Sequence, residues 1–219
     1  MRKLTLTQFM TLDGVVQSPG GPDEDSSGGF SKGGWLPPFA DQGMFEVMVA
    51  RFAKAAGFVL GRKTYETFAK HWPNVGDDDP VAAKLNHLPK YVASTTLGSS
   101  ADWDHTTILD EDVVESVRKL KAEEEEKEEE EEKGGELQIH GSGQLAQTLM
   151  RHNLIDVYEL LVFPVVLGQG KRLFETNINI NYSMRLSSTS TTNSGVVVLT
   201  YEPAGDLTFG SVGPPTHSP

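Results

Sequence analysis

The stretch that decides the fold is GELQIHGSGQLAQTLMRHNLIDVYELLVFPVVLGQGKRLF, residues 135–174. Its first part, ELQIH, alternates apolar and polar residues as a strand does, and it ends at two closely spaced glycines. The next part, SGQLAQTLMRHN, carries apolar residues at helical spacing, and DVYELLVF is a run that predicts a buried strand with a break at Pro164. Strand, turn, helix and strand in this order are typical of an α/β protein.

The HGSG turn, residues 140–143, lies between a predicted strand and a predicted helix, which is the context of a phosphate-binding loop. Gly141 and Gly143 would permit positive φ angles and a close approach of the backbone to a pyrophosphate. The spacing is not the G-x-G-x-x-G of a Rossmann fold, so a pyrophosphate turn and a purely structural turn both stay open. We expect His140 to be a hydrogen-bonded strand-end residue, and Ser142 lacks the G-x-S-x-G context of a hydrolase nucleophile.

The rest of the chain continues the alternation of strands and helices. The expected strands cover residues 3–9, 58–61, 90–96, 106–110, 134–141 and 156–168, followed by two alternating runs joined around NSG, residues 193–195. The expected helices cover residues 41–57, 62–72, 111–133 and 142–153, with Gly57 as the stop signal of the first and with the apolar positions of the third ending near Leu120. A long loop rich in Gly, Ser, Pro and Asp, residues 11–35, suggests a binding role, with disorder as the alternative. Residues 73–80 are expected to form a turn-rich loop.

These elements predict an α/β sandwich with a mostly parallel central sheet and an antiparallel C-terminal hairpin. Ligands of such sheets bind beyond the carboxyl ends of the parallel strands. The loops after Phe9, Leu60, Ala93 and His140 are therefore the candidate site loops.

Two of these loops carry groups that suit an anion. LGRKTYE, residues 60–66, places a glycine, Arg62 and Thr64 where a strand ends and a helix begins, so that backbone N–H groups and the helix dipole favour a phosphate. A helix cap with a solvated arginine is the alternative interpretation. ASTT, residues 93–96, offers three hydroxyls at the next strand end, although alone it is an ordinary turn.

Composition narrows the classes of function. The 219 residues suit one domain with additions, and the absence of cysteine removes disulfides, iron–sulfur clusters and thiolate zinc sites. The six histidines show no metal-ligand spacing, so we expect no metal. There is neither a basic cluster for nucleic acid nor an apolar run long enough for a membrane span, and we expect a cytoplasmic protein.

Much of the net charge of −12 lies in EEEEKEEEEEK, residues 123–133, which contains nine Glu and two Lys. Apolar positions of the preceding helix stop near Leu120, and like charges at i,i+4 destabilise a helix. We expect a solvated or disordered insertion, with an acidic docking element as the alternative.

Four segments in one order carry a resemblance: TLDGVV, LGRKTYETFAKHW, YVAST and the opening stretch of residues 135–174. Together they resemble the dihydrofolate reductase-like superfamily, and more closely its branch that shares the reductase domain of the bifunctional riboflavin-biosynthesis deaminase/reductase. The implied fold is a three-layer sandwich over residues 1–203, with an acidic insertion at 121–135 and a flexible tail at 204–219. Without cysteine this sequence cannot supply the ligands of the zinc deaminase module, so we expect a stand-alone reductase domain.

The resemblance implies an NADPH-dependent reductase, active as a homodimer, that uses no metal. The positions matching the family's cofactor contacts are Gly14, Gly61, Arg62, Lys63, Thr64, Ser94, Thr95, Gly141, Ser142, Gly143 and Gln144. In relatives the 61–64 segment holds the cofactor phosphates, the hydroxyls at 94 and 95 lie near the adenosine 2′-phosphate, and the 141–144 turn covers the pyrophosphate. Asp13 and Gly14 match the loop beside the nicotinamide, which makes Asp13 a catalytic candidate.

The candidate proton donor is also chosen by its resemblance to relatives. Classical dihydrofolate reductases use a carboxylate that follows a W-x-L-P stretch, and here WLPPFADQGMF places Asp41 after Trp35 with a spacing that differs by one residue. A carboxyl group against apolar neighbours would have a raised pKa and could protonate a ring nitrogen. Asp41 is equally suited to be a helix N-cap.

The expected reaction is hydride transfer to a pterin, a pyrimidine or a related heteroaromatic substrate, resembling 5-amino-6-(5-phosphoribosylamino)uracil reductase of riboflavin biosynthesis. A substrate phosphate would need basic residues, and the candidates are Lys32, Lys171 and Arg172. The alternative is a non-catalytic nucleotide-binding or assembly module whose acidic segment binds a partner.

Overall fold

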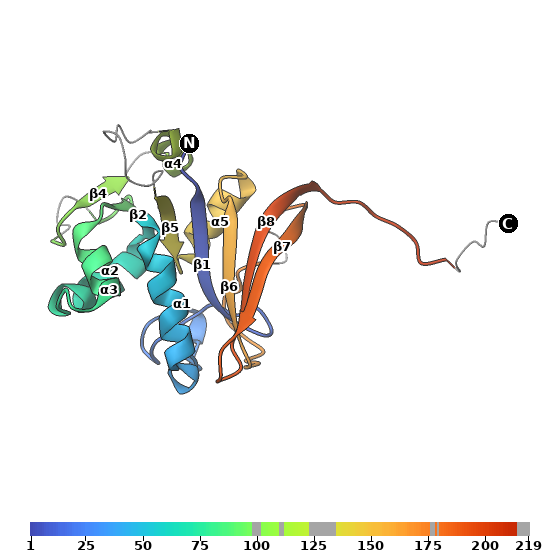
Figure 1. The fold of residues 1–219 in the computed structure, drawn as a ribbon, viewed down its shortest axis with the longest axis horizontal. Coiled ribbons are helices and arrows are strands. Elements are labelled where there is room, and N and C mark those ends of the chain that lie inside the picture. The colour runs from blue at the N-terminus through green and yellow to red at the C-terminus, as the bar shows by residue number, and fades with distance from the viewer. Residues whose placement is uncertain (98–101, 110–111, 123–134, 176–177, 179, 214–219) are drawn as a thin grey trace.

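The computed structural model describes residues 1–97, 102–109, 112–122, 135–175, 178, 180–213. Its centre is one eight-stranded sheet in the order β4-β3-β2-β5-β1-β6-β8-β7. Figure 1 shows β4 near one end of this sheet, β1 in the middle, and the long β7–β8 hairpin at the other end. The strands are β1 Leu4–Thr11, β2 Ala55–Gly61, β3 Lys90–Ala93, β4 Thr106–Leu109, β5 Glu136–His140, β6 Val157–Phe163, β7 Tyr182–Thr191 and β8 Val197–Asp206.

Six strands are parallel, and the last two are antiparallel, as the sequence predicts. β1 pairs in parallel with β5 on one side and with β6 on the other. The hairpin is attached through β6, which pairs antiparallel with β8. β6 is thus an interior strand that ends directly before Pro164, which explains its apolar sequence.

Helices cover both faces of the sheet, so the α/β three-layer sandwich is confirmed. The helices are α1 Gln42–Ala53, α2 Arg62–His71, α3 Pro80–His87, α4 Val113–Ala122 and α5 Gly143–Arg151, with 3₁₀ turns at Ser27–Gly29, Pro37–Phe39 and Trp72–Asn74. α4 and α5 pack on the face that presents Leu6 and Ile139. Residues of α1, α2 and α3 pack on the opposite face around Phe58 and Leu60.

The expected end of the first helix was wrong, and one helix was not predicted. α1 ends at Ala53, and Gly57 lies inside β2, where a Cβ atom would come within 3.2 Å of the carbonyl oxygen of Pro89. Gly57 is therefore needed for close strand packing and does not stop the helix. The segment after the Asp-rich turn also forms a helix, α3, because the side chain of Asp79 accepts from the N–H groups of Val81 and Ala82 and Pro80 occupies the first turn.

Beneath α1, the sheet carries a buried polar network. Arg51, which is 7% exposed, pairs with Glu159 of β6 and with Glu136 of β5. The amide Nε2 of Gln138 donates to the carbonyl oxygen of Arg51 at 2.7 Å, and the hydroxyl of Thr5 donates to Glu136 at 2.6 Å. This network fixes the C-terminal half of α1 across β1, β5 and β6.

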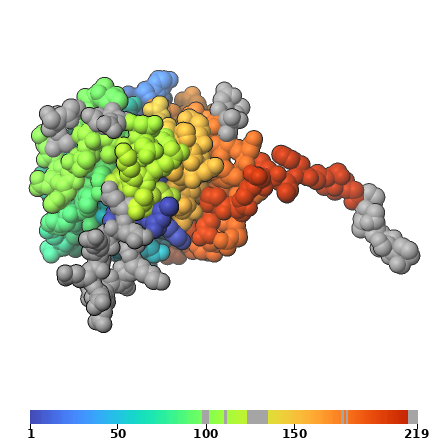
Figure 2. Space-filling model, turned by 90° about the horizontal axis from the view of Figure 1, so that it is seen from above, coloured from blue at the N-terminus to red at the C-terminus, as the bar shows by residue number. Residues whose placement is uncertain are grey.

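Two expected features fall at or beyond the edge of the described part. The acidic run, residues 123–133, lies outside the described residues. β8 extends to Asp206, three residues beyond the expected domain end at 203, and residues 207–213 project from the body of the molecule (Figure 2). Within the described part of the chain, no helix has the length and apolarity that crossing a membrane requires.

Candidate functional site

The candidate loops follow strands that are neighbours in the sheet. The order β3-β2-β5-β1 brings the ends of these strands to one edge, so the loops after Ala93, Gly61, His140 and Thr11 lie side by side. The sheet therefore brings together the groups that the sequence placed in four separate turns.

Ser142 joins two of these loops directly. The backbone N–H of Gly61 donates to the Ser142 hydroxyl at 2.9 Å, and that hydroxyl donates to Thr64 Oγ1 at 2.9 Å. Ser142 itself has a φ of 55°, and Gly141 has a φ of 58°. The expected positive φ is thus found at Gly141 but not at Gly143, because Ser142 takes the second left-handed position of the turn.

The joined loops present two helix N-termini to the same space. α2 begins after Gly61 and α5 begins after Ser142, and neither N-cap residue makes a side-chain hydrogen bond to its helix. The first N–H groups of a helix have no intrahelical partner, and the helix dipole places partial positive charge there. Residues 61–64 and 141–144, here called the cradle, can therefore hold an anion such as a phosphate.

Arg62 links the cradle to the next loop. Its guanidinium donates to Thr96 Oγ1 at 2.5 Å and also pairs with Glu66 one turn along α2. Ser94 Oγ accepts from the N–H groups of Thr96 and Leu97, which closes this turn. The predicted residues Arg62 and Ser94 thus belong to one connected surface, with Thr95 exposed beside them.

Three other predicted residues belong to the cradle. Lys63 is 69% exposed and reaches Asp25 of the long loop after β1. Gln144 is exposed in the first turn of α5. A Cβ atom on Gly143 would lie 3.5 Å from a methyl group of Val16, so the loop after β1 packs directly against the start of α5.

Asp13 organises the loop edge beside β1. Its carboxylate accepts from the N–H groups of Leu167 and Gly168, and pairs with Arg172 at 3.3 Å. Burial acts to raise the pKa of Asp13, but hydrogen bonds from Thr11 and from these backbone groups outweigh it and lower the pKa to about 2. Gly14 follows in a left-handed conformation with a φ of 81°, where a side chain would be strained.

Asp41 differs from the expectation of a raised pKa. Its carboxylate caps α1 through the N–H of Met44 at 2.8 Å, and it accepts from the N–H of Ser194 in the β7–β8 turn at 2.8 Å. The bond from Met44 is the main reason that the pKa of Asp41 is lowered. The β7–β8 turn that Asp41 contacts lies on the far side of β6 in the sheet order, whereas the cradle lies at the ends of β2 and β5. Asp41 is thus bound to a different part of the sheet from the cradle. The N-cap interpretation is confirmed, and a catalytic role for Asp13 or Asp41 stays a prediction.

His140 is a buried structural residue at the end of β5. It is 5% exposed, stacks on Phe52 with ring centroids 4.3 Å apart, and shares a hydrogen bond with Gln138 Oε1. Burial lowers the pKa of His140 to about 3, with the charge of Arg51 acting in the same direction. His140 is therefore neutral at physiological pH. In the described residues, no three His, Asp or Glu side chains form a group suited to a metal.

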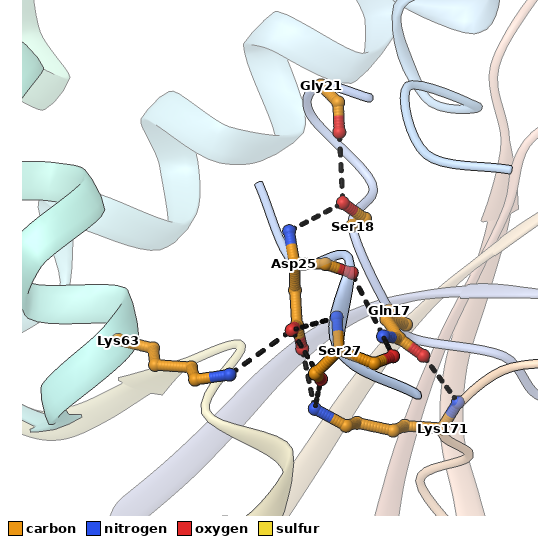
Figure 3. A network of polar contacts seen from close by, with 7 residues as sticks. All are labelled: Gln17, Ser18, Gly21, Asp25, Ser27, Lys63 and Lys171. Atoms are coloured by element: carbon orange, nitrogen blue, oxygen red, sulfur yellow. Dashed lines mark hydrogen bonds and ion pairs between the residues drawn. The ribbon is translucent and has the colours of Figure 1, made fainter. Parts of the chain in front are cut away.

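The three basic residues considered for a substrate phosphate all have partners within the chain. Lys32 Nζ donates to the carbonyl oxygen of Leu167, and Arg172 pairs with Asp13. Lys171 Nζ lies 2.6 Å from Asp25, which no motif had indicated (Figure 3). Asp25 is separated from its two lysine partners by 38 and 146 residues, so only the fold could show these contacts.

Comparison with known proteins identifies a family and two related sequences. The family model described as RibD C-terminal domain matches residues 2–198. The uncharacterized protein YyaP of Bacillus subtilis (strain 168) is 26% identical over 204 residues, which are 91% of this chain and 94% of that protein. The uncharacterized protein YwjB of the same organism is 28% identical over 189 residues, covering 86% of this chain and 91% of that protein.

Solved structures share the fold. A pyrimidine reductase-like protein from Corynebacterium diphtheriae has a TM-score of 0.59 at 12% identity, covering 94% of this chain and 93% of that one. A diaminohydroxyphosphoribosylaminopyrimidine deaminase/5-amino-6-(5-phosphoribosylamino)uracil reductase from Thermotoga maritima has a TM-score of 0.58 at 14% identity, and the match covers 93% of this chain but 57% of that longer protein. Dihydrofolate reductase from Enterococcus faecalis, complexed with NADP(H), has a TM-score of 0.55 at 13% identity over 92% of this chain and 96% of that one.

Proposed function

This chain belongs to the RibD C-terminal domain family, and on that premise we propose that it is an NADPH-dependent reductase. The proposed reaction transfers a hydride to a pyrimidine, a pterin or a related heteroaromatic ring. The reference substrate is 5-amino-6-(5-phosphoribosylamino)uracil, after which the reductase activity of the Thermotoga maritima neighbour is named.

The observation that carries the proposal is the cradle formed by two uncapped helix N-termini joined through Ser142. The cradle fits the phosphates of a dinucleotide, because Gly141 lies in a left-handed conformation with only Thr64 Oγ1 close to the position of a Cβ atom, at 3.7 Å. Backbone N–H groups of residues 62–64 and 143–144 would hold the pyrophosphate. Arg62 and the turn of Ser94 and Thr95 would bind the 2′-phosphate, since a guanidinium suits a phosphate dianion.

The chain's own contribution to the reaction is binding and orientation. NADPH supplies a hydride when bound. The cradle would hold one end of the cofactor, and the loop that begins at Asp13 and Gly14 would border the edge beside β1, so that a donor and an acceptor could be held at short range. The pKa values of Asp13 and Asp41 are lowered, so both carboxylates are ionised at neutral pH and the proposal assigns neither of them as the proton donor.

A turnover panel tests the proposal. Purified protein is mixed with NADPH and, in separate reactions, with 5-amino-6-(5-phosphoribosylamino)uracil, a pterin and a quinone, and the loss of NADPH is followed together with the reduced product. We expect saturable NADPH oxidation with one of the heteroaromatic compounds and product formation in equal amount. Tight NADPH binding without turnover on any of them would instead favour the non-catalytic nucleotide-binding module.

A further inference from the structure

One carboxylate of the long loop after β1 lies between two lysines. Asp25 Oδ1 is 3.1 Å from Lys63 Nζ, and Asp25 Oδ2 is 2.6 Å from Lys171 Nζ (Figure 3). Ser27 completes the set, because its hydroxyl donates to Asp25 Oδ1 at 2.6 Å and accepts from Lys171 at 2.6 Å. Two cations and a hydroxyl around one carboxylate form a small anion receptor.

This group of Asp25, Ser27, Lys63 and Lys171 adjoins the cradle. Lys63 belongs to the first turn of α2, within the cradle itself. Lys171 is tied to the loop after β1, because its backbone N–H donates to Gln17 Oε1. Val16, the residue before Gln17, packs against Gly143 of the cradle. The carboxylate of Asp25 therefore connects the two sides of the edge at which a phosphate would be held.

The loop is built so that this one carboxylate points inward. The Asp25 side chain is 18% exposed, although its neighbours Asp23 and Glu24 are exposed. Gln17 Nε2 donates to the carbonyl oxygens of Asp25 and Ser27, which fixes the backbone on both sides of the carboxylate. Burial acts to raise the pKa of Asp25, but the contacts with Lys171, Ser27 and Lys63 outweigh it and hold the pKa well below its usual range.

We propose that Lys63, Lys171 and Ser27 form an anion site whose resident ligand is Asp25, and that a phosphate group bound at the cradle displaces this carboxylate. The inference rests on the proposed function insofar as the ligand is a nucleotide cofactor or a phosphorylated substrate. Asp25 then sets the affinity for that ligand, because each binding event must break two ion pairs before the lysines can contact the phosphate. Phe30 and Trp35, both buried, keep the end of the loop anchored when Asp25 is released.

A matched pair of charge-neutral variants tests this directly. Asp25→Asn and Asp23→Asn remove the same charge from the same loop, but only the first removes the resident ligand. Binding of inorganic pyrophosphate is measured by calorimetry at low ionic strength. We expect Asp25→Asn to bind about tenfold more tightly than Asp23→Asn, and the gain to disappear in Asp25→Asn/Lys171→Ala. Equal or weaker binding by Asp25→Asn would overturn the proposal.

The wild-type protein provides a second test that does not depend on a variant folding. Saturating pyrophosphate should speed amide hydrogen exchange in residues 20–29, and unchanged or slower exchange there contradicts displacement.

Binding of ribose 5-phosphate with and without saturating NADPH shows which phosphate occupies the site. If NADPH blocks the binding of ribose 5-phosphate, the ligand is the cofactor's phosphate. If ribose 5-phosphate binds independently of NADPH, the ligand is a substrate phosphate. If NADPH binds and is oxidised but Asp25→Asn shows no gain, the inference fails while the proposed function stands. A gain for pyrophosphate without NADPH turnover supports the inference and counts against the function.

Discussion

At the scale of single residues, Ser142 does more than the sequence pattern indicated. The pattern assigned it no chemistry, and its value lies in the hydroxyl that accepts from Gly61 and donates to Thr64. In this position Ser142 has a left-handed backbone conformation, with a φ of 55°, which is strained for a residue with a Cβ atom. The contact between the two N-termini therefore depends on one side chain that could not be identified from spacing alone.

Replacing Ser142 tests that dependence. Ser142→Ala keeps the backbone strain and loses both hydrogen bonds, so we expect the free energy of unfolding to fall by about 1–2 kcal/mol. Ser142→Gly loses the same bonds but relieves the strain, and it should be less destabilised. Chemical denaturation of both variants measures the difference. An unchanged stability of Ser142→Ala would show that the hydroxyl does not hold the two loops together.

His140 gives stability a defined pH dependence. Because the folded protein keeps His140 neutral down to about pH 3 while an unfolded histidine takes up a proton near pH 6.5, the unfolded state binds more protons between these values. The free energy of unfolding should therefore fall as the pH falls below 6.5, by at most about 1.4 kcal/mol per pH unit from this group. Denaturation between about pH 7 and pH 4.5 should show a shallower slope for His140→Gln than for wild type. The exposed His152→Gln is the control, and equal slopes for wild type and His140→Gln would refute the assignment.

At the scale of elements, the sequence predicted strands better than the contacts between their ends. The HGSG turn and the GRKT segment were each located correctly, because a strand followed by an amphipathic helix is a local pattern. The end of α1 was misplaced because Gly57 suited a stop signal, whereas tertiary packing against Pro89 is what requires glycine. The position of Asp25 depended on contacts with distant parts of the chain, which no local pattern contains.

The buried network beneath α1 makes a sharp prediction about stability. Arg51→Met keeps the apolar stem but leaves Glu159 and Glu136 buried without their cation, so we expect a loss of about 3–5 kcal/mol in the free energy of unfolding. Arg51→Met/Glu159→Gln removes one of the stranded charges and should be less destabilised than the single variant. Denaturant unfolding of Arg51→Met, Glu159→Gln and the double variant measures this, and simple additivity of the two single substitutions would argue against a coupled network.

At the scale of the whole molecule, the fold class and the edge of the sheet that carries the cradle followed from the alternation of strands and helices. The proton donor could not be predicted in this way. Hydrogen bonds that lower the pKa of Asp13 and Asp41 come from residues far along the chain, at 167–168 and at 194. The homodimer expected from the resemblance stays a prediction.

The acidic run, residues 123–133, lies in the sequence between α4 and β5, and we expect it to be a solvated insertion. Deleting residues 123–133 should leave NADPH turnover unchanged and alter the free energy of unfolding little, since the run contains only Glu and Lys and the core residues of α4 end at Leu120. Steady-state kinetics and thermal unfolding of the deletion variant measure both quantities. Loss of turnover would contradict its description as a solvated insertion.

The central claim is that the cradle binds NADPH. A calorimetric titration of NADPH into the wild-type protein, Arg62→Ala/Thr64→Ala and the exposed control Lys70→Ala tests it most directly. We predict saturable binding by wild type and Lys70→Ala, and binding weaker by at least about tenfold in the double variant. Absence of saturable binding by wild type, or equal affinity in all three proteins, would contradict it.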